Sequence, residues 1–342
     1  MRSGFFSKKC FFDFNNQQDK LIFCNQELNF FPLINQNHDQ IKHTICMAIL
    51  NFFYPHTIVN HFKSQLIELE KKNQSIDLIF SQVLNFIDIS NYKINNLSIH
   101  ITLQEPKLHQ NDLNHKILIR NFLCDFLKLS QDKITVQAGT GERIGDTGKS
   151  KATIFIANIS FNKKNEKNQS LIGFGYDRHR FSLQDNIEKK PMICGQKIPY
   201  HKNIDAHSDG DIVFHAMVNA IFSVIAEGDI GDHFPDTNSE WRNASPIKFL
   251  EYAINLLKKK SLQIKSIKIE IITSLRFQNI LKKMNFLEKA SRDLMRILNI
   301  KNDKSCHIKL NLANAKNKNR DERCIKNDLG IDANVRIEFV TK

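Results

Sequence analysis

The sequence lacks the features that most quickly assign a chain to a class. Its seven cysteines are scattered and form no CxxC pair, so neither a disulfide framework nor a thiolate zinc site is indicated, and a reducing compartment is expected. No run approaches the roughly 18 apolar residues of a membrane span, and the opening segment has neither a continuous apolar stretch nor a small-residue cleavage site. We therefore expect a soluble protein that is not secreted and has no membrane partner.

Basic charge, by contrast, is plentiful. Lys and Arg outnumber Asp and Glu by 49 to 36, which gives a net charge of +13. This charge suits an anionic partner such as nucleic acid, a phosphorylated metabolite or an acidic surface. The aromatic residues, however, lie in apolar segments and are not interleaved with Lys and Arg as a nucleic-acid platform requires. We therefore expect no nucleic-acid partner.

The 342 residues suffice for two domains. Segment 162–169, NKKNEKNQ, is polar throughout and is the predicted linker between a domain at 1–161 and a domain at 170–342. Residues 34–64 align without a gap on residues 206–236, at a constant offset (206 − 34 = 172). The matched pairs include Asp39 with Asp211, His43 with His215 and Phe62 with Phe234. The chain is therefore interpreted as a tandem repeat.

Periodicity gives the fold class. Apolar and polar residues alternate in IKSIKIEIIT and CHIKLNLA, as in half-buried strands. DIVFHAMVNAIFSVIA and SPIKFLEYAINLLKKK have the spacing of amphipathic helices, and NILKKMNFLEKASRDLMRIL is expected to form one more. We predict the α+β class, with two tandem domains that each consist of a mixed β-sheet with helices packed on one face.

Two segments of the second half could hold a metal ion. In GYDRHRF, Asp177 and His179 are one residue apart and point to the same side of an extended segment, while His215 lies on the first turns of the following helix. One carboxylate and two imidazoles suit a zinc-like ion with a position left for substrate, although such histidines are also common in hydrogen-bonded structure. The segment GDIGDHFPDT, at 228–237, could bring its backbone close to a small polar ligand, or form a simple turn with an Asx cap.

The segments GYDRHRF, IDAHSDGDIVFHA and GDIGDHFPDT, in this order and spacing, resemble the 2-C-methyl-D-erythritol 2,4-cyclodiphosphate synthase family over most of residues 171–342. The resemblance implies a homotrimer of small α+β domains in which a divalent metal, usually zinc, is held by Asp177, His179 and His215. It places His207 and Ser208 beside the substrate phosphates. The residues that it implies for methylerythritol binding are Asp229, Gly231, Phe234 and Asp236.

The reaction is likewise implied by the resemblance. In that family the 2-phosphate of a cytidine diphosphate-linked methylerythritol attacks the phosphate nearest the erythritol, closes a ring and expels CMP, within non-mevalonate isoprenoid precursor synthesis. No protein nucleophile is needed, since the protein folds the substrate back on itself and neutralises crowded phosphates. A metal ion assists as a Lewis acid.

The family's nucleotide-binding loops, APKM and TTTEKLGFTGR, come from a neighbouring subunit. The second half departs from both, with SLRFQN and LANAKNKN, and Lys316 stands at the acidic position. The first half keeps them in LQEPKL and QAGTGERIGDTGK, and the nucleotide-binding residues implied there are Pro106, Lys107, Leu108, Gly139 and Thr140. Glu142 is the implied carboxylate for a second divalent ion, magnesium or manganese, that accompanies the substrate phosphates.

The first half shows the opposite losses. FFDFNN retains Asp13 but has Asn15 in place of the histidine, and NQNHDQIKHT keeps His43 but loses the HSDG residues. We hypothesise that the repeats have specialised, so that the second domain supplies the metal and the reacting phosphates while the first supplies the cytidine site and Glu142. The alternative is a catalytically degenerate paralogue that binds a nucleotide or assembles with an intact synthase.

Assembly and location follow from the resemblance. A homo-oligomer built of trimer-like rings is expected, but a two-domain chain does not divide three evenly. A mixed ring, three chains forming two rings, and partnership with a separate synthase all stay open. The pathway points to a bacterial cytoplasm, with a plastid as the alternative.

Overall fold

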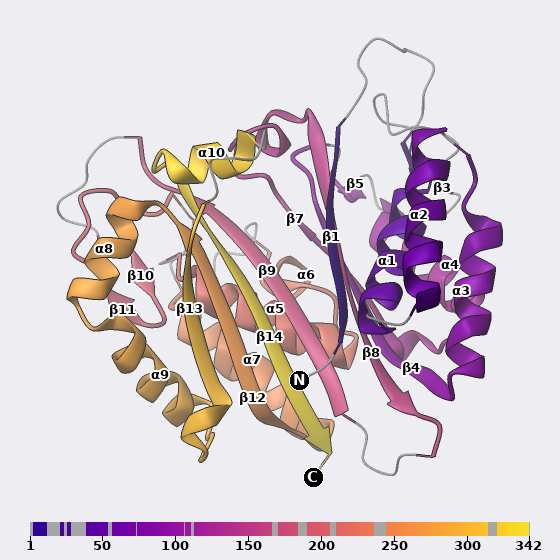
Figure 1. Ribbon diagram of the computed structural model, residues 1–342. Coiled ribbons are helices and arrows are strands. Elements are labelled where there is room, and N and C mark those ends of the chain that lie inside the picture. The colour runs from indigo at the N-terminus through magenta and orange to yellow at the C-terminus, as the bar shows by residue number, and fades with distance from the viewer. Residues whose placement is uncertain are drawn as a thin grey trace.

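The computed structural model describes residues 3–11, 21–23, 26–28, 39–53, 57–72, 74–105, 107–110, 113–165, 170–183, 190–205, 210–235, 244–313 and 320–341. The fold is α+β, as predicted, with one four-stranded mixed sheet in each half of the chain and helices packed on one face of each sheet (Figure 1). Among the described residues, no helix has the length and apolar character needed to cross a membrane.

The first sheet has the strand order β1-β8-β4-β7, in which only the β4–β7 pairing is parallel. Its strands are β1 (Gly4–Phe11), β4 (Tyr92–Thr102), β7 (Ile134–Gly139) and β8 (Ala152–Lys163). The helices of this half are α1 (Gln40–Phe53), α2 (Thr57–Lys71), α3 (Asp77–Ile89) and α4 (His115–Leu127), with short 3-10 turns at Gln131–Lys133 and Thr147–Lys149. Two small hairpins pair β2 (Leu21–Phe23) with β3 (Gln26–Leu28) and β5 (His109–Gln110) with β6 (Leu113–Asn114).

The second sheet has the order β13-β12-β14-β9, and only β12–β13 is parallel. Its strands are β9 (Ser170–Arg180), β12 (Leu262–Thr273), β13 (Cys306–Leu312) and β14 (Gly330–Thr341). The helices are α5 (Ile212–Ile225), α6 (Ile230–His233), α7 (Pro246–Lys259), α8 (Leu275–Lys283), α9 (Phe286–Ile297) and α10 (Arg320–Lys326). A hairpin of β10 (Met192–Ile193) and β11 (Gln196–Lys197) and a 3-10 turn at Asp303–Ser305 complete this half.

The two halves repeat one architecture down to small details. The sheet orders match strand for strand, and the pairing of the central strand shifts register at the same place, after Ile94 in β4 and after Ile264 in β12. The tandem repeat expected from the sequence is therefore present in the fold. The predicted linker at 162–169 overlaps the end of β8, which runs to Lys163, because this residue still pairs with Tyr92 at the start of β4.

Helix α5 differs from expectation in one respect. Asp211 caps its start, as an acidic N-terminus suggests, by accepting hydrogen bonds from the amides of Val213 and Phe214. The predicted amphipathic helix is instead buried on every side. The first half covers its outer face, where Thr135 donates to the carbonyl of Ser223 and Gln137 to that of Asn219.

The two halves also meet between the sheets. Strand β9 turns its even-numbered residues toward the first sheet, where Phe5 lies 5.2 Å from Phe174 between ring centroids, and His100 lies 5.2 Å from Tyr176. The side chain of Asn158 donates to the carbonyl of Ile172. The contact thus combines aromatic packing with hydrogen bonds to the backbone of β9.

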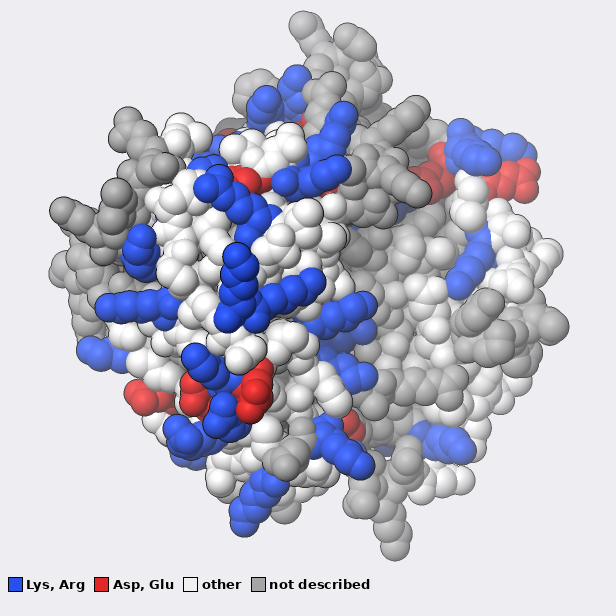
Figure 2. Space-filling model, turned by 60° about the vertical axis from the view of Figure 1, so that its left-hand side comes forward, with Lys and Arg blue, Asp and Glu red and all other residues white. Residues whose placement is uncertain are grey.

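Equivalent positions on the two sheets carry different chemistry. The shared register pairs Ser98 with Lys268 and His100 with Glu270 on the central strands. Ser98 and His100 are buried, and His100 packs against Tyr176 of the second half. Lys268 and Glu270 are exposed on the open face of the second sheet. Figure 2 shows the neighbouring side of the molecule, where Lys and Arg are spread in small groups with fewer Asp and Glu.

One predicted helix is two helices in the structure. The segment NILKKMNFLEKASRDLMRIL, expected as one helix, is divided between α8 and α9. Asn285 between them has a φ of 52°, a left-handed conformation that asparagine adopts more readily than most residues. The apolar spacing continues across this turn because both helices pack on the same core.

Candidate active site

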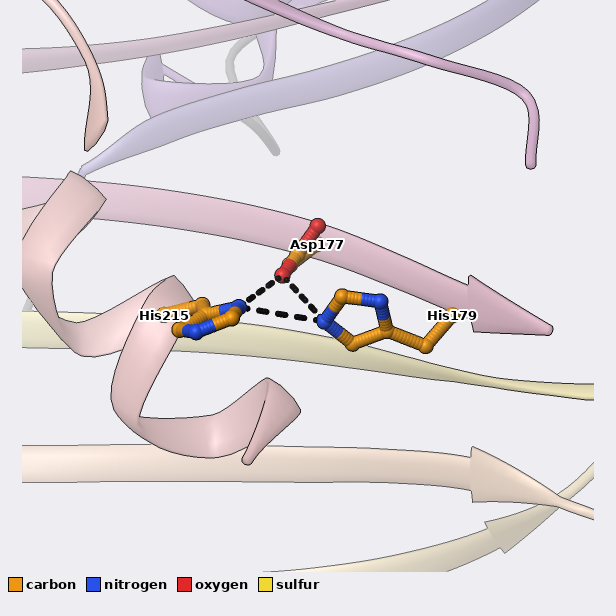
Figure 3. A group of neighbouring side chains, drawn as sticks. All are labelled: Asp177, His179 and His215. Atoms are coloured by element: carbon orange, nitrogen blue, oxygen red, sulfur yellow. Dashed lines mark hydrogen bonds and ion pairs between the residues drawn. The ribbon is translucent and has the colours of Figure 1, made fainter. Parts of the chain in front are cut away.

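Asp177, His179 and His215 form one compact cluster (Figure 3). The Oδ2 atom of Asp177 lies 3.1 Å from Nε2 of His179 and 3.2 Å from Nδ1 of His215, and these two nitrogens are 3.1 Å apart. Tetrahedral ligands at ordinary zinc bond lengths lie roughly 3.3 Å from one another. One carboxylate and two imidazoles that converge at such separations fit a zinc-like ion.

Local structure explains why these side chains converge. Asp177 and His179 alternate along β9 and so face α5, and His215 is on the first turn of that helix. The helix can approach closely because β9 has glycine at the contact points. A Cβ atom on Gly175 would lie 1.9 Å from the carbonyl oxygen of Ala216. The three side chains therefore converge because glycines of β9 allow α5 to pack closely on the strand.

The charges of the cluster are strongly coupled. Burial disfavours the carboxylate form of Asp177, but the two imidazoles outweigh it and hold the pKa of this group far below its usual range. Burial likewise opposes a charged His179, but Asp177 outweighs it and raises the pKa of the imidazole, with a further contribution from Glu142. A metal ion bound here would replace the proton that these groups otherwise share.

The contribution of Glu142 matters because this residue belongs to the other half of the chain. Its loop, residues 139–148, packs over the start of β14, which pairs with the end of β9, and the side chain of Ile144 lies 2.4 Å from the position of a Cβ atom on Gly330. The loop is anchored by Thr147, whose hydroxyl donates to the buried carboxylate of Asp321 at 2.8 Å. Residues predicted to bind nucleotide and metal therefore lie on the two sides of one interface within a single chain.

The two predicted nucleotide-binding loops are joined to each other. The amide of Leu103 donates to the carbonyl of Gly139 at 3.0 Å, and the amide of Arg143 donates to the side chain of Gln104 at 3.1 Å. Glu142 and Arg143 have φ values of 52° and 56°, so two consecutive residues other than glycine adopt the left-handed conformation. Backbone strain of this kind is concentrated at functional loops.

Individual residues of these loops are placed differently. Thr140 donates a hydrogen bond to Glu142, and Lys107 is exposed. Leu108 is buried and therefore anchors its loop by packing. Pro106 lies outside the described residues.

The predicted methylerythritol loop is held mainly by protein contacts. Asp229 is buried, caps α6 through the amide of Gly231, and accepts from the amide of Ala138 and the ammonium group of Lys116. Phe234 packs on Phe249 with ring centroids 4.5 Å apart. Asp236, His207 and Ser208 lie outside the described residues.

One interpretation of the first half is corrected. Gly4 contacts the carbonyl of its helix as Gly173 does in the second half. The positions of the two β9 ligands, four and six residues beyond the glycine, are consequently taken by Lys8 and Cys10, and not by Asp13 and Asn15. Asp13 and Asn15 lie outside the described residues. A lysine in place of the carboxylate disfavours a divalent ion there.

Sequence reasoning missed Lys116 and Asp321. Each is buried at the interface between the halves and contacts residues more than a hundred positions away. No local pattern distinguishes either residue from the many exposed charges of the chain.

Comparison with known proteins shows the family of the chain. The sequence matches the YgbB family over residues 12–161 and again over residues 170–323. The chain belongs to the YgbB family. The two matches cover both halves, so each half of the tandem repeat is a copy of the same family unit.

Curated relatives and solved structures extend the comparison. The chain is 34% identical over 155 residues to the "Bifunctional enzyme IspD/IspF" of Wolbachia pipientis wMel, and 41% identical over 100 residues to that of Bradyrhizobium diazoefficiens. These matches cover 45% and 29% of this chain but only 38% and 24% of the relatives. Similar solved structures include an IspF of Plasmodium falciparum in complex with CDP, with 25% identity, a TM-score of 0.40, and 52% of this chain and 99% of that chain covered. The bifunctional IspDF of Campylobacter jejuni has 18% identity and a TM-score of 0.43, with 77% and 73% covered.

Proposed function

We propose that this protein converts 4-diphosphocytidyl-2-C-methyl-D-erythritol 2-phosphate to 2-C-methyl-D-erythritol 2,4-cyclodiphosphate with release of CMP, as a phosphorus-oxygen lyase of non-mevalonate isoprenoid precursor synthesis. The observation that carries the proposal is the convergence of Asp177, His179 and His215 in one compact cluster, in a second half to which Thr147 anchors the loop that carries Glu142. Membership of the YgbB family and the IspD/IspF relatives support the same reaction class.

In this proposal the two halves of the chain supply different parts of one site. The second half would hold the divalent ion, which supplies Lewis-acid neutralisation of phosphate charge when bound. Glu142 would hold a second divalent ion beside the diphosphate. His207 and Ser208 would contact the reacting phosphates. The cytidine site would comprise Pro106, Lys107, Leu108, Gly139 and Thr140, and the methylerythritol site would comprise Asp229, Gly231, Phe234 and Asp236.

In the proposed reaction, an oxygen of the 2-phosphate forms a bond to the phosphorus nearest the erythritol. The bond from that phosphorus to the bridging oxygen breaks, and this oxygen leaves on CMP. The chain contributes geometry and charge and no covalent bond. Loops fixed on both sides of one interface hold the two ends of the substrate, so that the reacting phosphates meet at a higher effective concentration than in solution.

The test exploits the location of both groups in one chain. Glu142→Gln and His179→Ala should each abolish CMP release while the zinc content falls only in the second variant. An equimolar mixture of the two inactive variants should stay inactive, since every chain then carries one damaged side of its own interface. Restored turnover in the mixture would place the site between chains, and a zinc-loaded wild type without CMP release would refute the proposed reaction.

A second candidate is a nucleotide-binding paralogue without turnover. The favouring observation is that both carboxylate oxygens of Asp229 already accept hydrogen bonds from protein groups. Calorimetry with CDP beside the CMP-release assay separates the two functions. Binding of CDP without release of CMP would show that the protein is a nucleotide-binding paralogue.

A further inference from the structure

We propose that Lys116 is a positioning residue that fixes the 228–235 loop of the second half against strand β7 of the first half. The proposal rests on the proposed function, because it assigns this contact a role in bringing the substrate loop and the 139–148 loop to a fixed separation. Lys116 is neither a predicted ligand nor a predicted substrate contact.

Lys116 reaches across the interface from the first turn of α4. Its own amide donates to Asn114, which caps this helix, so the start of the side chain is fixed. Its ammonium group lies 2.8 Å from Oδ2 of Asp229 and 2.6 Å from Oδ1 of Asp232. Lys116 is 8% exposed and Asp229 3%, so the cation and one of its two carboxylates are both removed from water.

The same loop is tied to β7 directly. Oδ2 of Asp229, which accepts from Lys116, also accepts from the amide of Ala138 at 2.9 Å. The side chain of Gln137 donates to the carbonyl of Gly228 at 2.8 Å. Ala138 is followed by Gly139, where the loop that carries Glu142 begins. The carboxylate of Asp229 is thus the point at which helix α4, strand β7 and the 228–235 loop join.

The positive charge of Lys116 stabilises this junction. Burial lowers the pKa of a lysine, but the two carboxylates outweigh it here and raise the pKa of Lys116 above its ordinary value. A neutral side chain at this position would leave two neighbouring carboxylates without their shared cation, and a buried charge without its partner is strongly unfavourable. The loop would then move away from β7, toward water.

The experiment compares Lys116→Met with Lys116→Arg. Methionine keeps most of the length but loses the charge, so kcat/KM for CMP release should fall by about tenfold or more. Zinc content and the inhibition constant of CMP should stay as in the wild type, because neither predicted site contains Lys116. Amide hydrogen exchange in a peptide covering 228–235 should become faster. Arginine should restore slow exchange and most of the activity.

Lys128→Met is the matched control, since Lys128 is exposed at the other end of the same helix. It should change neither exchange nor turnover. Lys116→Met with wild-type kinetics and wild-type exchange would overturn the proposal. Should that variant not fold, Lys116→Met combined with Asp232→Asn removes the excess negative charge and decides the matter by the same exchange measurement.

Failure of the proposed function gives a different result. A wild type that releases no CMP refutes the reaction, while the exchange rates of the 228–235 peptide still report on the contact itself. Slow exchange that persists in Lys116→Met and in the Asp232→Asn combination refutes Lys116 as the residue that holds the loop, whatever reaction the site performs.

Discussion

Gly173 lies directly against the carbonyl oxygen of Ala220, so that a Cβ atom on the glycine would stand 2.1 Å from that oxygen. The first half repeats this contact between Gly4 and Ala48, with 2.0 Å. In both halves a glycine of the edge strand allows the first long helix to lie against the sheet. Both helices carry a histidine at the equivalent position, His43 in α1 and His215 in α5, but only in the second half does the edge strand place Asp177 and His179 beside it.

Gly173→Ala and Gly4→Ala should therefore destabilise the protein similarly but differ in metal binding. Each added methyl group forces a helix away from its strand, at a cost of about 1–3 kcal/mol. Only Gly173→Ala moves His215 relative to Asp177, so only this variant should bind zinc more weakly. Urea unfolding gives the stability change, and competition with a chelator gives the affinity. Equal zinc affinity in the two variants would contradict the role assigned to the strand–helix contact.

The metal cluster predicts a sharp loss on removal of either histidine. His179→Ala or His215→Ala leaves two of the three converging ligands, and bound zinc should fall from about one ion per chain to nearly none. His307→Ala is a suitable control, because His307 is exposed on β13. Elemental analysis after dialysis measures the content. A wild type that retains no divalent ion would exclude a metal site here.

Acid should weaken the protein through His100. Burial lowers the pKa of this histidine from 6.5 to about 4, and neither ring nitrogen has a hydrogen-bond partner among the described residues. The unfolded chain takes up a proton below its own pKa, while the folded state does not until the lower value is reached. Stability is therefore lost as the pH falls from 6.5 toward 4. Between about pH 7 and pH 4.5 the loss should be about 2–3 kcal/mol.

His100→Leu should remove that part of the pH dependence. Denaturant unfolding of wild type and variant at several pH values measures the difference in slope. Parallel curves for the two proteins would show that His100 does not titrate in this way.

The anchor of the 139–148 loop predicts a large stability effect. Asp321 is fully buried and accepts hydrogen bonds from the amide and the hydroxyl of Thr147. It also forms an ion pair with the ammonium group of Lys9, at 2.8 Å. Asp321→Ala removes the acceptor of the Thr147 hydroxyl and one of the two carboxylates that Lys9 contacts, the other being Asp146, at a cost of about 1–3 kcal/mol. Thermal unfolding should show the loss, whereas Asp125→Ala, at an exposed site, should leave the midpoint almost unchanged. A small effect at Asp321 would mean that solvent replaces this contact.

The sequence predicted the fold class and the repeat from periodicity and constant spacing, whereas the convergence of Asp177, His179 and His215 was implied by the resemblance to the synthase family. Only Asp177 and His179 share a strand face by spacing alone, because His215 meets them through the packing of α5 on β9. The break at Asn285 escaped prediction, since the apolar pattern of the two helices runs on without interruption across it. The contact of Lys116 with Asp229 escaped for a different reason. It joins residues 113 positions apart, and only the docking of one half on the other brings them together.

The repeat also has a consequence for growth of the assembly. A contact between unlike faces of identical units can be added indefinitely, giving a closed ring or an open fibre. Here the face that docks in the first half is uncharged at Ser98, whereas its counterpart in the second half bears Lys268 in water. A further unit using the same face would have to dehydrate that ammonium group. Adding a further unit at this face would therefore cost more free energy than the contact between the two halves of one chain.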